Sequence, residues 1–87
     1  MRFLVEMSLK VQPTPAIMAL IPAETARGLE LDAQGVREHL FLAADNSRGW
    51  QVFRADSLDA VESVVQSFPF AQYSMITITA LAEQPSE

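Results

Sequence analysis

The sequence contains no cysteine and only one histidine among its 87 residues. Without cysteine the chain cannot form a disulfide framework or a thiolate metal cage, and one histidine does not complete a protein zinc site of the usual kind. It also has no G-x-G-x-x-G motif, P-loop or nucleophile elbow. If the chain is an enzyme, acid–base chemistry without metal or cofactor is therefore the expected form of catalysis.

Positive charge and long hydrophobic runs are also scarce. Six Lys and Arg stand against eleven Asp and Glu, for a net charge of −5, which argues against nucleic-acid and anionic-membrane partners. No apolar run approaches the roughly 18 residues that span a bilayer, and Glu6 and Lys10 interrupt any apolar core of a signal peptide. We expect a cytoplasmic protein with a single domain over residues 1–87. A chain this short buries only about 60–65% of its unfolded surface, which favours a homo-oligomer.

Alternating apolar and polar residues predict a first strand over residues 1–11. Thr14 and Pro15 then provide the N-cap and first position of a helix, which continues to a natural stop at Gly35. Pro22 interrupts this helix, because proline removes an internal hydrogen bond and clashes with the preceding turn. A kink or two abutting helices are expected there.

The second half of the chain is expected to hold three strands and a second helix. The strands cover residues 35–44, 50–55 and 73–82, and a hairpin turn over 45–49 joins the first two. Asp56 or Ser57 caps the helix and Pro69 ends it. The resulting β-α-β-β-α-β order predicts an α+β, ferredoxin-like fold, in which two helices cover one face of an antiparallel sheet.

The face of the sheet that no helix covers is expected to be apolar. Its predicted residues are Leu4, Leu40, Leu42, Trp50 and Val52, with one set from the last strand. Exposed apolar surfaces of this kind usually mark an interface. Two such sheets that face each other would form a dimeric α+β barrel.

Glu24 is the first candidate for catalysis. The apolar stripe of the first helix comprises Ile17, Leu20, Ile21, Gly28 and Leu31, and Glu24 lies within it. Gly28 leaves room one turn later, so that the carboxylate would line a cavity, where desolvation raises its pKa toward the range of a general base or acid. In the alternative, the Pro22 kink rephases the helix, Leu29 turns inward with its alanine neighbours, and Glu24 is hydrated.

His39 is the second candidate, because histidine titrates near neutrality and suits proton transfer. The alternative is a half-buried strand histidine that is hydrogen-bonded to a neighbour. With Glu24 on the helix and His39 on the sheet, the two side chains could face each other across the layers.

Aromatic and arginine side chains are the candidates for substrate binding. Tyr73 and Trp50 each combine an apolar body with one polar group, which suits a ring-shaped ligand, although both also occur as ordinary core or interface residues. Phe41 shares the strand face of His39. Arg54, like Arg48, could pair with a substrate carboxylate, but an arginine near a hairpin usually does not.

The chain from Gly35 to its end resembles the muconolactone isomerase family without gaps. The matching residues are Gly35, His39-Leu40, Ala44, Val52-Phe53, Ser57, Ala60, Pro69, Tyr73, Ile76, Leu81 and Pro85-Ser86. Glu24 also matches a family glutamate, and the most specific features are the His39-Leu40 pair and the Pro69…Tyr73 spacing. The stretch before Glu24 matches poorly.

The resemblance implies a ferredoxin-like subunit, dimeric barrels and higher assemblies such as decamers. It also implies a cofactor-free isomerase of aromatic compound catabolism, which shifts a proton in an unsaturated lactone to give the enol-lactone of 3-oxoadipate. This reaction needs a base, a proton donor and a group that stabilises the enolate. The resemblance assigns the first two roles to Glu24 and His39, and a hydrogen bond to the oxyanion to Tyr73.

Several departures leave the substrate open. The chain is shorter at its front, carries Pro22 and Gly28 in its first helix, and differs around the 45–49 turn. Another lactone, or the substrate of a small cyclase of secondary metabolism, fits as well. A non-catalytic small-molecule-binding or assembly domain of the same fold and a cofactor-less monooxygenase are the alternatives to an isomerase.

Overall fold

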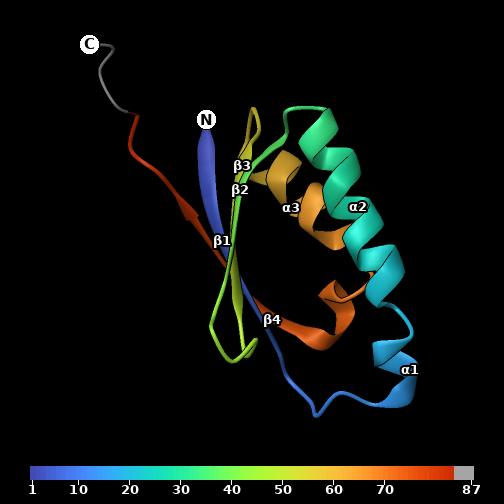
Figure 1. Ribbon diagram of the computed structural model, residues 1–87. Helices are drawn as coiled ribbons and strands as arrows, with labels where there is room; N and C mark the ends of the chain where they lie inside the picture. The colour runs from blue at the N-terminus through green and yellow to red at the C-terminus, as the bar shows by residue number, and fades with distance from the viewer. Residues whose placement is uncertain (84–87) are drawn as a thin grey trace.

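The computed structural model describes residues 1–83 as one α+β unit (Figure 1). Its elements are β1 (Arg2–Leu9), α1 (Pro15–Met18), α2 (Ile21–Ala33), β2 (Arg37–Leu42), β3 (Gly49–Arg54), α3 (Leu58–Gln66), the 3-10 turn η1 (Ala71–Tyr73) and β4 (Ser74–Ala80). Pro85 and Ser86, which contribute to the family resemblance, lie outside the described residues.

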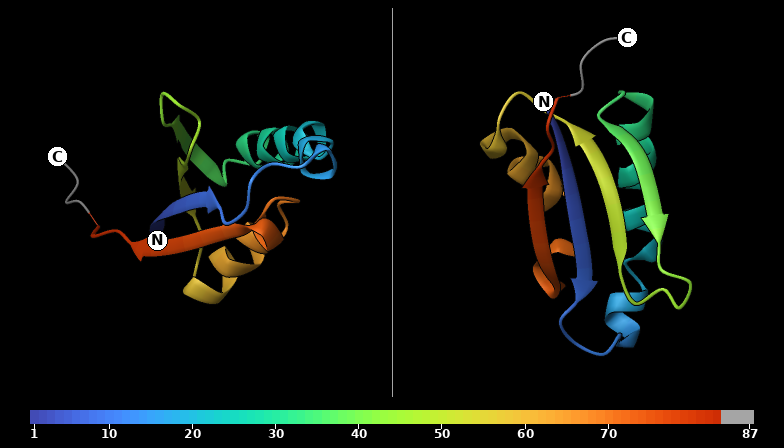
Figure 2. Two further views of the ribbon diagram at one scale, coloured as in Figure 1. Left: turned by 90° about the horizontal axis from the view of Figure 1, so that it is seen from below. Right: turned by 90° about the vertical axis from the view of Figure 1, so that its left-hand side faces the viewer.

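The four strands form one antiparallel sheet in the order β2-β3-β1-β4. Figure 2 shows the strands side by side in its right-hand view, with α2 and α3 behind them on the same face. Within residues 1–83, no helix lies on the other face of the sheet. The predicted ferredoxin-like βαββαβ architecture is confirmed.

The first helical segment consists of two abutting helices. Thr14 caps α1, and its Oγ1 accepts a hydrogen bond from the Ile17 N–H at 3.2 Å. Pro22 lies in the first turn of α2, where its missing N–H would have no partner within the helix. Gly35 follows α2 with a φ of 72°, a left-handed conformation that glycine adopts at little cost. The predicted break and the predicted stop are both confirmed.

The core lies between the sheet and the two long helices. It comprises Phe3, Val5, Leu31, Phe53, Val61, Val65 and Phe68, all of which are buried. The rings of Phe53 and Phe68 pack at a centroid distance of 6.2 Å and join the sheet to the end of α3. Burial of each large side chain contributes about 1.5–3 kcal/mol, so this cluster fixes the helices on one face.

A β-bulge in β2 decides which residues of that strand face the helices. Arg37 pairs with Phe53, but the next pair joins His39 to Val52, so one extra residue is inserted on β2. The bulge places Leu40 on the helix-facing side, opposite the buried Gln51, and Leu42 on the same side. The prediction that Leu40 and Leu42 lie on the uncovered face is therefore wrong. Strict alternation does not hold where a bulge rephases the strand.

Candidate functional site

A cavity of about 870 Å³ lies on the helix-bearing side of the sheet, and both α2 and the sheet line it. Most of its lining is apolar, including Met7, Leu9, Ile21, Leu29, Leu40, Leu42, Phe68 and Phe70. Glu24, Arg37, Gln51 and Ser74 add polar groups, and the β2–β3 turn adds Asp45, Asn46, Ser47 and Arg48. An apolar cavity of this size with a few convergent polar groups is typical of a small-molecule site.

Glu24 lies in the first turn of α2 and is partly buried in this cavity. Its Oε1 accepts a hydrogen bond from the Phe70 N–H at 2.8 Å. Burial raises the pKa of the Glu24 carboxyl group, and the Phe70 hydrogen bond and the charge of Arg37 partly oppose the shift. The carboxylate is thus a stronger base than a hydrated one.

The exposure of individual α2 residues excludes the alternative in which the Pro22 kink turns Leu29 inward and Glu24 into water. Gly28 and Leu31 are buried, whereas Leu29 is 60% exposed and Ala26 is also exposed. The predicted inward stripe with Glu24 is confirmed, although its member Ile21 is itself 41% exposed where it lines the cavity.

Arg37 is a further charged group of the cavity. Its Nε and Nη2 donate to the two carboxylate oxygens of Asp32 at 2.7 and 2.9 Å, and its Nη1 donates to Gln51 Oε1 at 2.9 Å. The Arg37 side chain is only 10% exposed. The hydrogen bond from Arg37 lowers the pKa of Asp32, so this carboxylate stays ionised at neutral pH.

Gly28 allows the guanidinium of Arg37 to lie directly against α2. A Cβ atom at Gly28 would lie 2.6 Å from Nη1 and 2.7 Å from Nη2 of Arg37. Real Cβ contacts are essentially never shorter than 3.0 Å. The room predicted at Gly28 therefore exists, and a cation occupies it.

His39 lies on the open face of the sheet, away from this cavity. It is exposed, and its ring stacks on Phe41 at a centroid distance of 5.8 Å. Glu24 lines the cavity on the opposite side of the sheet. The expectation that Glu24 and His39 face each other is therefore wrong within one chain, because the β2 bulge turns His39 outward.

The other predicted binding residues do not line the cavity. Trp50 is on β3, opposite Phe41 on the open face, and its Nε1 donates to Glu6 Oε1 at 2.8 Å. Tyr73 is partly buried in η1, and its backbone carbonyl accepts a hydrogen bond from the Lys10 N–H at 2.8 Å.

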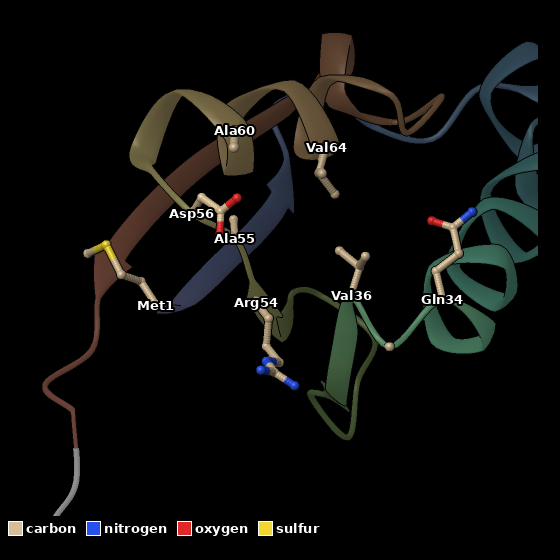
Figure 3. Close-up of a pocket in the computed structure, with 9 residues that line it drawn as sticks. Met1, Gln34, Val36, Arg54, Ala55, Asp56, Ala60 and Val64 are labelled. Carbon is tan, nitrogen blue, oxygen red and sulfur yellow. The ribbon is translucent and has the colours of Figure 1, made fainter.

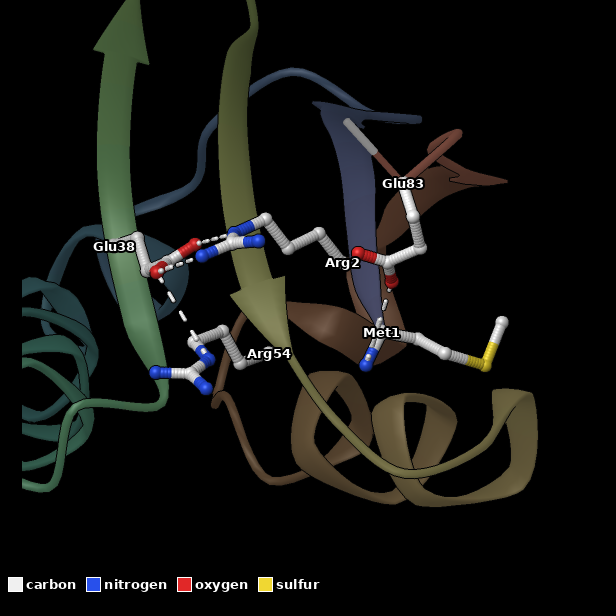
Figure 4. Close-up of polar contacts among 5 residues, drawn as sticks. All are labelled: Met1, Arg2, Glu38, Arg54 and Glu83. Carbon is white, nitrogen blue, oxygen red and sulfur yellow. Dashed lines mark hydrogen bonds and ion pairs between the residues drawn. The ribbon is translucent and has the colours of Figure 1, made fainter. Parts of the chain in front are cut away.

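Arg54 also lies on the open face, where it forms a long ion pair with a carboxylate that Arg2 shares. Its Nε is 4.0 Å from Glu38 Oε2, and the same carboxylate accepts a hydrogen bond from Arg2 Nε at 2.7 Å. Figure 4 shows Glu38 between the two guanidinium groups. Of the six predicted site residues, the chain brings His39, Phe41, Trp50 and Arg54 to one face and Glu24 to the other.

A second hollow of about 450 Å³ lies between α3, the end of β3 and the connection from α2 to β2 (Figure 3). The charged residues that line it, Arg54 and Asp56, are both exposed. Exposed charges are well hydrated and offer little for proton transfer. The larger cavity with Glu24 is therefore the candidate site.

The sequence-based interpretation missed Arg37 and Gln51. One signal was present in the sequence. Gln51 and the apolar Phe53 are two residues apart on one strand and so share a face, which predicts a polar amide on the helix-facing side among apolar residues. A buried amide needs a hydrogen-bonding partner, and Arg37 provides it.

Within residues 1–83, no group of three or more His, Asp or Glu side chains is placed to hold a metal ion. In the same part of the chain, no helix has the length and apolar character needed to cross a membrane.

Two solved structures are similar to this chain along nearly its whole length. No curated protein sequence matches significantly. A solved structure of muconolactone isomerase superposes with a TM-score of 0.85 and 27% identity, over 100% of this chain and 94% of the other. The 5-chloro-2-hydroxyhydroquinone dehydrochlorinase of Burkholderia phenoliruptrix AC1100, solved with 2,5-dihydroxybenzoquinone, gives a TM-score of 0.76 at 20% identity, over 97% of this chain and 96% of that one.

The model of one protein family matches the chain from its first residue to its last. That family is muconolactone delta-isomerase, and the match covers residues 1–87. The chain therefore belongs to the muconolactone delta-isomerase family.

Proposed function

We propose that this protein is a cofactor-independent isomerase that moves a proton, and with it a double bond, within a small unsaturated lactone. Membership of the muconolactone delta-isomerase family supports an isomerase-like enzyme. The observation that carries the proposal is the partly buried Glu24 carboxylate, whose pKa is raised by burial in a cavity of substrate size.

The chemistry requires a base beside a C–H bond that is acidic because it is conjugated, through the ring double bond, with the lactone carbonyl. Glu24 accepts the proton from one carbon, the electron pair delocalises into the carbonyl as a dienolate, and the proton returns to a different carbon. The double bond moves while the composition of the substrate is unchanged. One carboxylate suffices for both transfers, since the conjugate acid of the base carries the proton that the second carbon needs.

His39 would contribute only if substrate also reached the open face. On that face His39 lies among Phe41, Trp50 and Val52, and a second sheet packed over them would enclose these side chains. The two roles proposed for Glu24 and His39 therefore belong to different surfaces of one chain, and they can be tested separately.

The test is turnover of muconolactone in deuterated water, followed by NMR as loss of the substrate and deuterium incorporation. Glu24→Gln is expected to reduce kcat by about a hundredfold or more, because general-base catalysis contributes about that much. Glu30→Gln, an exposed substitution on the same helix, is the matched control and should be neutral. Full activity of folded Glu24→Gln would overturn the assignment of the base.

The same assay decides the role of His39. If Glu24 performs both transfers, His39→Ala keeps most of the turnover, whereas a hundredfold loss with an unchanged oligomeric state would make His39 the proton donor. Oxygen uptake with a quinol substrate would instead indicate a monooxygenase. Binding of the lactone without any exchange would indicate a binding domain.

We further propose that the protein is a homodimer, or a higher oligomer built from dimers, in which the open faces of two sheets pack together. Phe41 and Met75 are exposed on this face and Leu4, Trp50 and Val52 are partly exposed. A second copy would bury this apolar surface. We also propose a cytoplasmic location, with which the absence of cysteine is compatible.

A further inference from the structure

Gln51 is a buried polar side chain that has no part in the proton transfer proposed for Glu24. It lies on β3, inside the sheet, where it pairs with Leu40 of β2 and Val5 of β1. Only 6% of Gln51 is exposed, and it lines the same cavity as Glu24. Burial of an amide is costly unless its polar atoms form hydrogen bonds, so both ends of this amide need an account.

Arg37 fixes the orientation of the Gln51 amide. Its Nη1 donates a hydrogen bond to Gln51 Oε1 at 2.9 Å. A guanidinium has no acceptor, so the reversed amide would place donors against each other. The amide nitrogen therefore points away from Arg37. The one partner that residues 1–83 offer it is Met7 Sδ, which lies 3.6 Å from Nε2.

The amide nitrogen of Gln51 keeps most of its capacity as a donor. A thioether sulfur is a weak acceptor, and the amide nitrogen carries two N–H groups. Within residues 1–83, no oxygen accepts a hydrogen bond from Nε2. Met7 and Gln51 both line the cavity, so this donor is available to an acceptor on a bound ligand.

We propose that Gln51 donates a hydrogen bond from Nε2 to the ring carbonyl oxygen of the lactone, and that this bond stabilises the dienolate. This inference rests on the proposed function of the Glu24 cavity. As the proton passes from carbon to the Glu24 carboxylate, the electron pair of the C–H bond delocalises onto the carbonyl oxygen, and Gln51 keeps both of its protons. A donor that is already oriented stabilises this charge without rearrangement.

The placement of the two side chains suits these separate roles. Glu24 belongs to α2 and Gln51 to the sheet, and both elements line the cavity. A lactone held between them would turn its C–H bond toward the base and its carbonyl group toward the amide. Most of the lining is apolar, and a hydrogen bond is electrostatically stronger there than in water. Tyr73, to which the family resemblance assigns this bond, does not line the cavity.

A purely structural amide, which serves only to hold Arg37, is the competing interpretation. Gln51→Glu separates the two, because the new carboxylate keeps an oxygen for Arg37 but has no N–H group. The adjacent guanidinium favours the ionised form of that carboxyl group. Gln51→Met removes the donor without adding a charge. A structural role predicts that Gln51→Glu behaves like the wild type, whereas a donor role predicts that both variants lose the hydrogen bond to the ligand.

The experiment is infrared difference spectroscopy of phthalide, a stable neutral lactone with a heavy carbon isotope in its carbonyl group, bound to the full chain. A hydrogen bond lowers the carbonyl stretching frequency, so the wild type should show a lower band than phthalide in hexane. We expect the band to return to the hexane value in Gln51→Met and Gln51→Glu. It should stay low in Gln66→Met, which changes an exposed glutamine of α3 outside the cavity. Turnover of muconolactone should fall about a hundredfold in Gln51→Met, as is typical when one such donor is removed.

The wild type alone can overturn the inference, whatever the stability of the variants. A bound carbonyl band at the hexane value would do so, as would the absence of phthalide binding. A low band that persists in folded Gln51→Met would also overturn it. A band that stays low in Gln51→Glu but not in Gln51→Met would show that Gln51 only holds Arg37, and would overturn it as well.

The proposed function fails independently of this inference. Full turnover by Glu24→Gln refutes the proposed function even when the carbonyl band depends on Gln51. An inactive Glu24→Gln whose bound phthalide keeps the lowered band supports both.

Discussion

At the scale of single residues, Glu24 combines a stability cost with a chemical advantage. Burial makes its carboxyl group harder to ionise, while the Phe70 N–H and Arg37 prevent the ionised form from becoming too costly. The first turn of α2 adds a favourable helix dipole for an anion. A carboxylate in this balance is more basic than one in water, which suits the proton abstraction proposed for it.

This balance predicts a pH-dependent stability that Glu24→Gln should remove. The pKa of Glu24 is raised in the folded chain, so the folded state binds more protons than the unfolded one between the ordinary carboxyl pKa of about 4.3 and the raised value. The favourable contribution of Glu24 to the free energy of unfolding is present below this window. It is lost as the pH rises through the window. Glu24→Gln should therefore be more stable than wild type at pH 7, and the difference should shrink toward pH 4.

Urea unfolding at several pH values measures this difference, with Glu30→Gln as the control for loss of an exposed charge from the same helix. A glutamine at position 24 retains an oxygen that can accept the Phe70 N–H, so the variant isolates the ionisation. A variant that is less stable than wild type at pH 7 would show that the carboxylate stabilises the fold instead.

At the scale of elements, the connection between α2 and β2 positions Arg37. Gly35 turns the chain with a φ of 72°, and β2 begins two residues later. Gly35→Ala should destabilise the protein by about 1–2 kcal/mol because of its left-handed backbone, although within residues 1–83 the added methyl group would meet no atom beyond the adjacent residues within 4 Å. Gly35→Asn should cost less, since asparagine tolerates this conformation. Equal stability of the alanine variant and wild type would contradict this account.

Regular periodicity made the helices and the face of Glu24 predictable from the sequence. The stripe that includes Glu24 depends on contacts within one helix, and the two prolines and Gly35 mark its boundaries locally. The break near Pro22 did not change which α2 residues face the sheet. α1 ends at Met18, and α2 is a separate helix that begins at Ile21. Local patterns were therefore sufficient for half of the candidate site.

The β2 bulge was not predictable, because pairing with β3 and the surrounding charges decide it. With the bulge, Arg37 reaches Asp32 and Gln51 on the helix side while Glu38 reaches Arg2 on the open face. Strict alternation that left Arg37 inside would have turned His39 inward as well. The sequence shows no local sign of this choice, so His39 was assigned to the wrong environment and Arg37 was overlooked.

At the scale of the whole molecule, the fold has one covered and one uncovered sheet face, and the two have different uses. The covered face holds the core and the Glu24 cavity. Across the open face, Leu4 and His39 both pair with Val52, and Phe41 pairs with Trp50. These cross-strand rows hold an apolar cluster, in which Trp50 also pairs with Glu6 of β1. The Arg2–Glu38–Arg54 cluster flanks it, as expected of an interface with a polar rim.

This arrangement predicts that a charge at Phe41 dissociates the proposed oligomer. Phe41 is 55% exposed in the single chain, so Phe41→Glu should leave the fold intact while it places an unpaired charge between two packed sheets. Leu58→Glu is the matched control, because Leu58 is 50% exposed but lies on α3, on the other side of the sheet. Analytical ultracentrifugation should show a dimer or larger species for wild type and Leu58→Glu, and a smaller species for Phe41→Glu. A monomeric wild type at micromolar concentration, or an unchanged Phe41→Glu, would exclude the open face as the interface.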